Sequence, residues 1–327
     1  MIGSTIERAA TWLWPNSYGE NDMRITLLRN PKAGNGKHGR KELVNALEKA
    51  GHQTICRSIK KKGWKAALKK QADVVVIAGG DGAMAKVASA LIGRETPLAI
   101  LPFGTANNLA RSLGFFASPK EIIAQLKDRK ERVFDVGVAQ GPWGKRFLFE
   151  GAGAGLLADY VHAANEEAEK EKEEKERKKL SKEQELTRHV ARLRRKLRGY
   201  RAQKWELELD GEDISGRYIL WEAMNIRSVG PALYLAPGAA TEDGRFDFVY
   251  VREQDRDLLL KYFDARLAGQ KTKSPLPIRR FKNLKIVWQR SAIHFDDETW
   301  PQSDEKPKRP ASIKIKVKSS ALQVLRP

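Results

Sequence analysis

Strand-like and helix-like patterns of apolar positions alternate along the first 135 or so residues. Runs typical of strands cover residues 25–28, 74–78 and 98–101, and helical patterns follow over 41–50 and 84–91. A strand that is buried on both faces reads as an unbroken apolar run, as 74–78 does. Because strand, loop and helix alternate, we predict an α/β domain with a largely parallel sheet.

The pattern changes to a β-rich one in the second part of the chain. Short alternating or β-branched runs, separated by Gly, Asp and Pro, cover 147–149, 205–209, 218–223, 246–251, 284–288 and 313–317. Such runs predict a second, sandwich-like domain. We therefore divide the chain into an N-terminal extension (1–22), an α/β domain (23–140) and a β-rich domain (141–311). A strand over 312–327 is a candidate to return to the first domain.

A charged helical insertion, residues 161–204, interrupts the second domain. Residues 166–185 hold nine acids and seven bases, and residues 186–204 hold eight bases and no acid. Leu186, Val190, Leu193 and Leu197 recur at steps of four, three and four, which places one apolar stripe on a basic helix. The stripe either covers the domain beneath a solvated face or faces a membrane or a partner. Trp12, Leu13 and Trp14 leave a similar choice between packing and membrane contact.

Charge narrows the partners that the chain can have. It carries 61 Lys and Arg against 41 Asp and Glu, a formal net charge of +20, so nucleic acid, an anionic membrane or a phosphate-rich substrate are the candidates. No zinc-finger spacing and no RNP-type pattern occurs, so we do not expect nucleic acid. The one cysteine, Cys56, excludes internal disulfides and suits a reducing compartment. No apolar run approaches the length that spans a bilayer, and we expect a cytoplasmic protein.

Three Gly-rich loops each follow a predicted buried strand. They are Asn-Pro-Lys-Ala-Gly-Asn-Gly at 30–36, Gly-Gly-Asp-Gly at 79–82 and Pro-Phe-Gly-Thr-Ala-Asn at 102–107. Backbone N–H groups and positive helix ends at such places bind anionic phosphate. Neither GxGxxG nor the P-loop pattern is present, which disfavours a dinucleotide dehydrogenase and a P-loop kinase. The loops predict a site for a nucleotide polyphosphate.

The three loops, the third read on to Arg111, closely resemble the motifs of the diacylglycerol kinase catalytic domain family. That family includes bacterial lipid kinases, sphingosine kinases and ceramide kinases. Gly-Gly-Asp-Gly alone also occurs in NAD kinases, but the other two loops do not fit an NAD kinase. The resemblance continues through Asn225, Gly230, Pro237 and the Asp243-Gly244 pair, and it covers nearly all of the chain after residue 23.

The resemblance implies that ATP binds in the cleft between the domains and that the second domain presents a lipid. Asp81 and its glycines would hold the phosphates and Mg²⁺. The residues implied for the nucleotide are Asn30, Gly34, Gly79, Gly80, Asp81, Gly82, Gly104, Thr105 and Asn107.

Family members carry an Asp-Gly-Glu motif whose glutamate is the general base. The matching stretch here is 296–298, so Glu298 takes the position of the base beside Asp81 as the catalytic pair, and Asp297 replaces the glycine. A carboxylate can accept the proton of a lipid hydroxyl while other groups bear the phosphoryl charge. The alternative is that these acids form a solvated turn.

The resemblance also implies a structural Mg²⁺ site, formed by Asp243 with the carbonyls of Ala240 and Arg245. Oxygen-only ligation suits this hard cation, although Asp-Gly is equally a plain turn signal.

Two positions depart from the family pattern. Ala83 and Lys86 stand where the family has a threonine and an acid, so a hydroxyl is lost and a carboxylate becomes a cation. We therefore hold two hypotheses: an ATP-dependent lipid kinase that acts at the inner membrane face, and a catalytically weak relative that binds nucleotide or lipid for regulation. The lipid stays open, and so does a homodimer.

Overall fold

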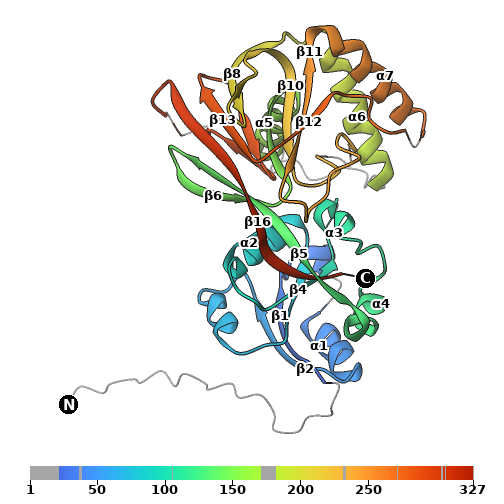
Figure 1. Ribbon diagram of the computed structural model, residues 1–327. Coiled ribbons are helices and arrows are strands. Elements are labelled where there is room, and N and C mark those ends of the chain that lie inside the picture. The colour runs from blue at the N-terminus through green and yellow to red at the C-terminus, as the bar shows by residue number, and fades with distance from the viewer. Residues whose placement is uncertain are drawn as a thin grey trace, which may run out of the picture.

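The protein is described by a computed structural model that covers residues 22–36, 39–104, 106–170, 182–230, 233–270, 272–302, 305 and 307–326. Trp12, Leu13, Trp14, Thr105 and part of the segment 166–185 lie outside these residues. Figure 1 shows two domains, one above the other, joined by two long strands. The upper domain is rich in strands and the lower one alternates strands and helices, which confirms the predicted fold class.

The N-terminal domain is built on four parallel strands in the order β2-β1-β3-β4. The strands are β1 (Arg24–Arg29), β2 (Gln53–Ser58), β3 (Val74–Gly79) and β4 (Leu98–Pro102). All six residues of β3 are buried, as its unbroken apolar run predicts. The helices are α1 (Arg40–Lys49), α2 (Asp81–Leu91), α3 (Asn108–Ser112) and α4 (Pro119–Ala124), with short 3₁₀ turns at η1 (Ala33–Gly36), η2 (Trp64–Lys69) and η3 (Leu126–Asp128).

The second domain surrounds an aromatic core that includes Trp221, Trp288 and Trp300. Its strands are β6 (Gly144–Leu148), β7 (Gly151–Gly155), β8 (Gln203–Leu209), β9 (Glu212–Asp213), β10 (Gly216–Met224), β11 (Phe246–Arg252), β12 (Ile278–Phe281), β13 (Asn283–Trp288), β14 (Ile293–Phe295) and β15 (Glu298–Trp300). The helices are α5 (Leu156–Lys170), α6 (Lys182–Arg198) and α7 (Arg256–Leu267), with a 3₁₀ turn at η5 (Glu253–Asp255). No described helix is both long enough and apolar enough to cross a bilayer.

Strand β7 was not predicted, because its sequence Gly-Ala-Gly-Ala-Gly is poor in strand-forming side chains. It is fully buried between β10 and β14. Glycine is needed at Gly151 and Gly155, where an added Cβ would lie 2.4 and 2.3 Å from backbone carbonyl oxygens of β10, and a Cβ at Gly153 would displace the carboxylate of Glu222. The strand is therefore selected for small size rather than for β propensity.

Two long strands, β5 (Lys130–Gly141) and β16 (Ala311–Arg326), pass through both domains as an antiparallel pair. Strand β16 pairs with β13 in the second domain and, near its end, with β4 in the first. The buried Asp135 carboxylate accepts hydrogen bonds from the backbone N–H of Ser320 (2.8 Å) and Gly244 (2.6 Å). This carboxylate fixes the point where β16 shifts register, between Lys318 and Leu322.

The apolar stripe of the basic helix packs on the second domain. Val190, Leu193 and Leu197 of α6 are buried in one cluster with residues of α7 such as Leu259 and Phe263. The stripe therefore covers the domain, and the hypothesis that it faces a membrane is wrong. Arg195 and Arg198 lie on the exposed side of the helix.

Candidate active site

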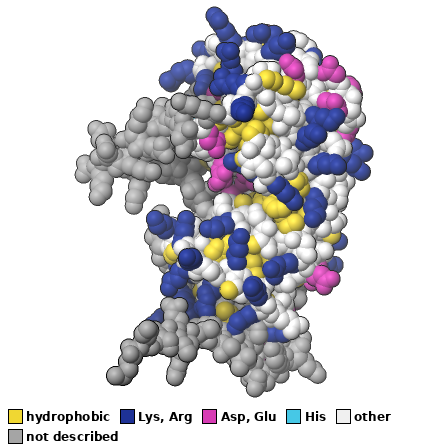
Figure 2. Space-filling view, turned by 90° about the vertical axis from the view of Figure 1, so that its left-hand side faces the viewer, with side chains coloured by type: hydrophobic (Ala, Val, Ile, Leu, Met, Phe, Trp, Pro, Cys, Tyr) yellow, Lys and Arg dark blue, Asp and Glu magenta, His cyan; other side chains and the backbone are white. Residues whose placement is uncertain are grey.

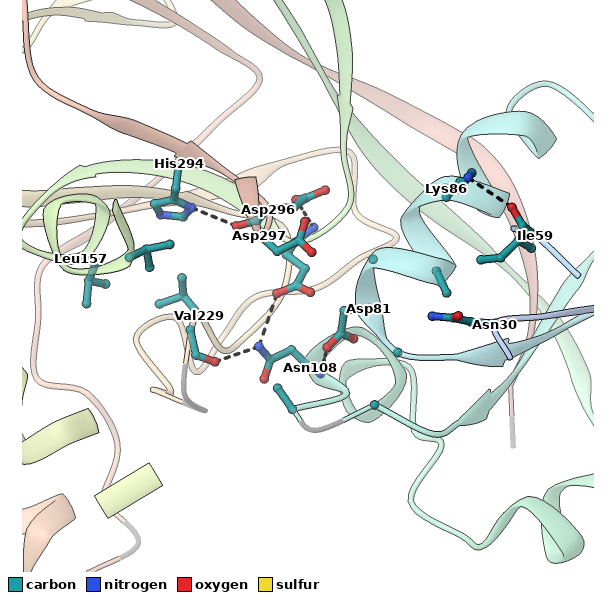
Figure 3. A pocket seen from close by; sticks show the side chains of 18 of the residues that line it. Asn30, Ile59, Asp81, Lys86, Asn108, Leu157, Val229, His294, Asp296 and Asp297 are labelled. Carbon is teal, nitrogen blue, oxygen red and sulfur yellow. Dashed lines mark hydrogen bonds between the residues drawn. The ribbon is translucent and has the colours of Figure 1, made fainter. Parts of the chain in front are cut away.

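A cavity of about 530 Å³ lies where the ends of β1, β3 and β4 meet helix α5 and the β14–β15 turn of the second domain. Figure 2 shows acidic side chains in the recess between the two domains, with basic side chains spread around it. Of the residues implied for the nucleotide, Asn30, Gly80, Asp81, Gly82 and Gly104 line this cavity. The structure therefore brings all three Gly-rich loops to one site (Figure 3).

The second and third loops meet through bare backbone. A Cβ at Gly80 would lie 2.9 Å from the Cα of Gly104, and a Cβ at Gly104 would lie 2.6 Å from the Cα of Gly80. No larger residue fits at either position without a shift of the main chain. The loops consequently present backbone to the cavity at the carboxyl ends of β3 and β4, where α2 begins, an arrangement that suits phosphate.

Three of the implied residues support the loops from behind the cavity. Asn107, with φ of 50°, accepts from the N–H of Gly104 (2.8 Å) and donates to its carbonyl (2.9 Å). The N–H of Gly34 donates to the carbonyl of Phe103 (3.0 Å), which ties the first loop to the third. A Cβ at Gly79 would lie 2.6 Å from that of Ala83. These residues hold the loops together rather than line the site.

Asp81 links the second loop to helix α3. Its two carboxylate oxygens accept from the backbone N–H groups of Asn108 and Leu109, each at 3.1 Å. Burial raises the pKa of Asp81, while these amides lower it and the carboxylate of Asp297 raises it further. Asp81 therefore has a structural task in addition to any role at a phosphate.

Glu150, between β6 and β7, was missed by the sequence analysis and faces Asp81 across the cavity. Asn108 donates to its Oε2 (3.4 Å) and to the carbonyl of Gly230 (3.1 Å). Burial, followed by the carboxylates of Asp81 and Asp296, raises the pKa of Glu150 well above its ordinary value. Glu150 itself lies in none of the motifs quoted from the sequence, and only the folded chain brings it to Asp81 and Asp296.

The β14–β15 turn adds two more carboxylates to the cavity. Asp296 accepts from the backbone N–H groups of Phe149, Glu150 and Gly151 at 2.8–3.1 Å. Burial raises the pKa of Asp296 to about 6 although these amides lower it. Asp297 faces the second loop, where a Cβ at Gly82 would lie 3.0 Å from its Oδ2.

Glu298 does not line the same cavity as Asp81. It begins β15 with 68% of its side chain exposed and lies 3.5 Å from the guanidinium of Arg146. It borders a neighbouring cavity of about 600 Å³, which shares Gly82, Lys86, Asp296 and Asp297 with the first. The two residues of the implied catalytic pair thus lie on either side of Asp297.

Lys86 borders both cavities, but its ammonium is directed away from Asp81 (Figure 3). The Nζ donates to the carbonyl of Ile59 (3.3 Å) and lies 5.9 Å from the centre of the Trp64 ring. The ammonium of Lys86 therefore contacts Ile59, which follows β2, and Trp64 of η2.

The Asp243 turn lies apart from both cavities. Asp243 accepts from the N–H of Arg245 (3.0 Å) and forms an ion pair with Arg280. Among the described residues, no three His, Cys, Asp or Glu side chains are grouped so as to hold a metal. The implied Mg²⁺ site with the carbonyls of Ala240 and Arg245 stays a prediction, and Arg280 would compete for its one carboxylate.

The donor set at the main cavity fits Mg²⁺ better. Asp81 and Glu150 offer oxygen ligands only, and the charge of Asp81 contributes to the raised pKa of Glu150, so a cation between them would relieve repulsion. Mg²⁺ in phosphoryl-transfer enzymes is held by one or two carboxylates together with substrate phosphates and water. Binding of this kind does not require a group of three protein side chains.

Two family descriptions match the chain in succession. Residues 24–139 match the diacylglycerol kinase catalytic domain, and residues 169–326 match the YegS C-terminal NAD kinase beta sandwich-like domain. A diacylglycerol kinase of Mycobacterium tuberculosis (strain H37Rv) is 26% identical over 324 residues, 93% of this chain and 95% of that protein. One of Bacillus subtilis (strain 168) is 25% identical over 260 residues, 76% of this chain and 80% of that protein.

Solved structures show the same fold. A diacylglycerol kinase structure from Bacillus anthracis str. Sterne superimposes with a TM-score of 0.65 at 18% identity, over 93% of this chain and 97% of that one. Another from the same organism gives a TM-score of 0.71 at 19% identity, over 96% of this chain and 99% of that one. With both matches in order along the chain, the protein carries a diacylglycerol kinase catalytic domain followed by a YegS-type second domain.

Proposed function

We propose that the protein is an ATP-dependent kinase that transfers the γ-phosphoryl group to the hydroxyl of a lipid. The observation that carries this proposal is the composition of one cavity. Bare glycine backbone, a group of carboxylates and an apolar wall meet there. The glycine backbone suits phosphate, the carboxylates suit a divalent cation, and the apolar wall suits a hydrocarbon chain.

The nucleotide half of the site belongs to the N-terminal domain. The phosphates would bind at 79–82 and Gly104, against the N-terminus of α2, with Asn30 at the rim. Asp81 and Glu150 would hold Mg²⁺, which supplies charge neutralisation for the transferred phosphoryl group. The close contact between Gly80 and Gly104 keeps this surface rigid, so the chain does not reorganise as charge develops.

The acceptor half belongs to the second domain. Leu157 and Val161 of α5, together with Val229, form an apolar wall opposite the glycine loops. An acyl or sphingoid chain would lie on this wall with its hydroxyl toward the β14–β15 turn. Glu298 would accept the hydroxyl proton there, and the guanidinium of Arg146, 3.5 Å away, would orient its carboxylate.

The relatives support a kinase, because those that align over most of the chain are named diacylglycerol kinases. The test is incubation of the purified protein with labelled ATP, Mg²⁺ and total membrane lipids, followed by organic extraction. We expect a labelled product in the organic phase, and mass spectrometry of that product identifies the lipid. A protein that binds ATP but labels no lipid would overturn the proposal.

A second candidate, a regulatory relative with weak activity, is favoured by one observation. Lys86 replaces an acid of the family pattern, and its ammonium lies against Ile59 and Trp64 rather than at the phosphates. The variant Lys86→Glu distinguishes the two hypotheses. A large gain of turnover in Lys86→Glu would support the hypothesis that the native protein is a catalytically weak relative. Efficient turnover by the wild type would exclude that hypothesis.

A further inference from the structure

A buried acid and a buried histidine are paired inside the second domain, directly behind the β14–β15 turn. His294 of β14 and Glu222 of β10 have side chains that are 4% and 1% exposed, and their Nε2 and Oε2 atoms are 2.7 Å apart. A buried ionisable pair costs desolvation energy that apolar residues of similar size would avoid. Its presence beside an apolar core therefore indicates a specific role.

The central strand leaves room for this pair. Gly153 of β7 is in register with Glu222 on one side and with His294 on the other. A Cβ at Gly153 would lie 2.1–2.4 Å from atoms of the Glu222 carboxyl group. The absence of a side chain at Gly153 thus leaves space for the Glu222 carboxyl group where it bonds His294.

Both ring nitrogens of His294 face acceptors. Nε2 faces the Glu222 carboxylate, and Nδ1 lies 3.2 Å from the backbone carbonyl of Asp296. An imidazole that donates from both nitrogens carries a positive charge. Burial alone would lower the pKa of His294, but Glu222 and then the Asp296 carbonyl raise it above its ordinary value.

The contact to Asp296 reaches the site. Asp296 has φ of 51°, an uncommon conformation for a residue with a side chain, and the turn holds only it and Asp297. Its carbonyl is bound by His294 while its carboxylate collects three backbone N–H groups, among them that of Glu150. Asp296 is thus held both by its backbone carbonyl and by its side chain.

We propose that His294, held by Glu222, is a positioning residue that sets the geometry of the 296–298 turn and so aligns Asp297 and Glu298 with the glycine loops. This role rests on the proposed kinase function. It acts through the backbone of Asp296, although His294 also borders the main cavity. The hydrogen bonds of the pair lie within the second domain, so we expect nucleotide binding by the glycine loops to change little when the pair is altered.

The test replaces Glu222 by glutamine, which conserves volume and removes the charge that holds His294. We expect Glu222→Gln and His294→Gln to lower kcat by about 10- to 100-fold while KM for ATP stays within about twofold of wild type. The matched control is His52→Gln in the N-terminal domain, where His52 is equally buried at 3% exposed. The control should lower thermal stability without lowering kcat.

A second readout does not depend on kinase activity. Amide hydrogen exchange of Phe149, Glu150 and Gly151, which Asp296 binds, should be at least tenfold faster in Glu222→Gln than in wild type, and ¹⁵N NMR of wild type should show both ring nitrogens of His294 protonated. Unchanged kcat in Glu222→Gln, or unchanged exchange at these amides, overturns the inference. If wild type labels no lipid, the exchange rates alone decide it, so failure of the kinase proposal is distinguished from failure of this one.

Discussion

At the scale of single residues, the contact between Gly80 and Gly104 is the tightest constraint on the phosphate surface. Replacing Gly104 by alanine would place a Cβ 2.6 Å from the Cα of Gly80 and the Oδ1 of Asn107. We expect Gly104→Ala to weaken ATP binding by at least tenfold, measured by calorimetry with Mg²⁺, because the two loops must separate. Gly238→Ala is the control, since a Cβ there meets nothing within 4 Å. Equal affinity in both variants would remove the contact from nucleotide binding.

The base is the second question at this scale. If Glu298 accepts the hydroxyl proton, Glu298→Gln should lower turnover by roughly two to four orders of magnitude with ATP affinity nearly unchanged. Asp297→Asn is the matched comparison, because Asp297 borders both cavities and Glu298 only one. Steady-state kinetics on a lipid acceptor measures both. Normal turnover in Glu298→Gln together with a large loss in Asp297→Asn would transfer the role of base to Asp297.

At the scale of elements, an ion pair joins Arg24, the first residue of β1, to Asp73, the residue before β3. Arg24 donates to Asp73 from its backbone and side chain at 2.7–3.2 Å, and these bonds lower the pKa of Asp73. A lowered pKa in the fold means that the pair adds stability above the ordinary value near 3.8, and that this stability is lost as pH falls through the folded pKa.

We therefore expect Arg24→Met to cost no more than about 1 kcal/mol at pH 7, because both side chains are partly exposed. The difference from wild type should shrink as pH falls below the ordinary pKa of an aspartate. Urea unfolding at pH 7 and at about pH 3 measures it, and a difference that is constant with pH would mean that packing of the arginine stem matters rather than charge.

The basic helix α6 is a second element with a testable surface. Val190, Leu193 and Leu197 are buried, so this helix offers a membrane its outward charges, such as Arg195 and Arg198. We propose that the protein sediments with anionic vesicles at low salt and is released at high salt, since each exposed base near the surface contributes about 1 kcal/mol. Arg195→Glu with Arg198→Glu should reduce the bound fraction. Equal binding to neutral vesicles would contradict an electrostatic attraction.

How far the sequence could predict the structure depends on whether a signal is local. Strand β3 and the three loops were predictable, because an apolar run and the glycines that follow it are contiguous. Glu150 and the Glu222–His294 pair were not, because each is defined by residues that only the folded sheet brings together. Strand β7 was missed for a different reason: its glycines satisfy steric requirements set by the backbone of β10 and by the side chain of Glu222.

At the scale of the whole molecule, β5 and β16 make the two domains depend on each other. Strand β16 pairs with β13 in one domain and with β4 in the other, and with β5 along nearly its whole length. We expect removal of residues 311–326 to prevent folding of both domains rather than to release an intact N-terminal domain. Limited proteolysis and circular dichroism of the truncated chain test this, and a protected fragment covering residues 23–129 would contradict it.

That arrangement has a consequence for synthesis on the ribosome. Strand β16 is synthesised after the entire second domain, and β4 cannot pair with it before then. During translation β4 therefore has an unpaired edge. Domains made of one continuous segment can fold one after the other as they leave the ribosome. In this chain the sheet of the N-terminal domain is completed only when the C-terminal strand β16 has been synthesised. The nascent N-terminal domain is therefore the part most in need of a chaperone, and codon changes that slow synthesis between β5 and β16 should lower the soluble yield.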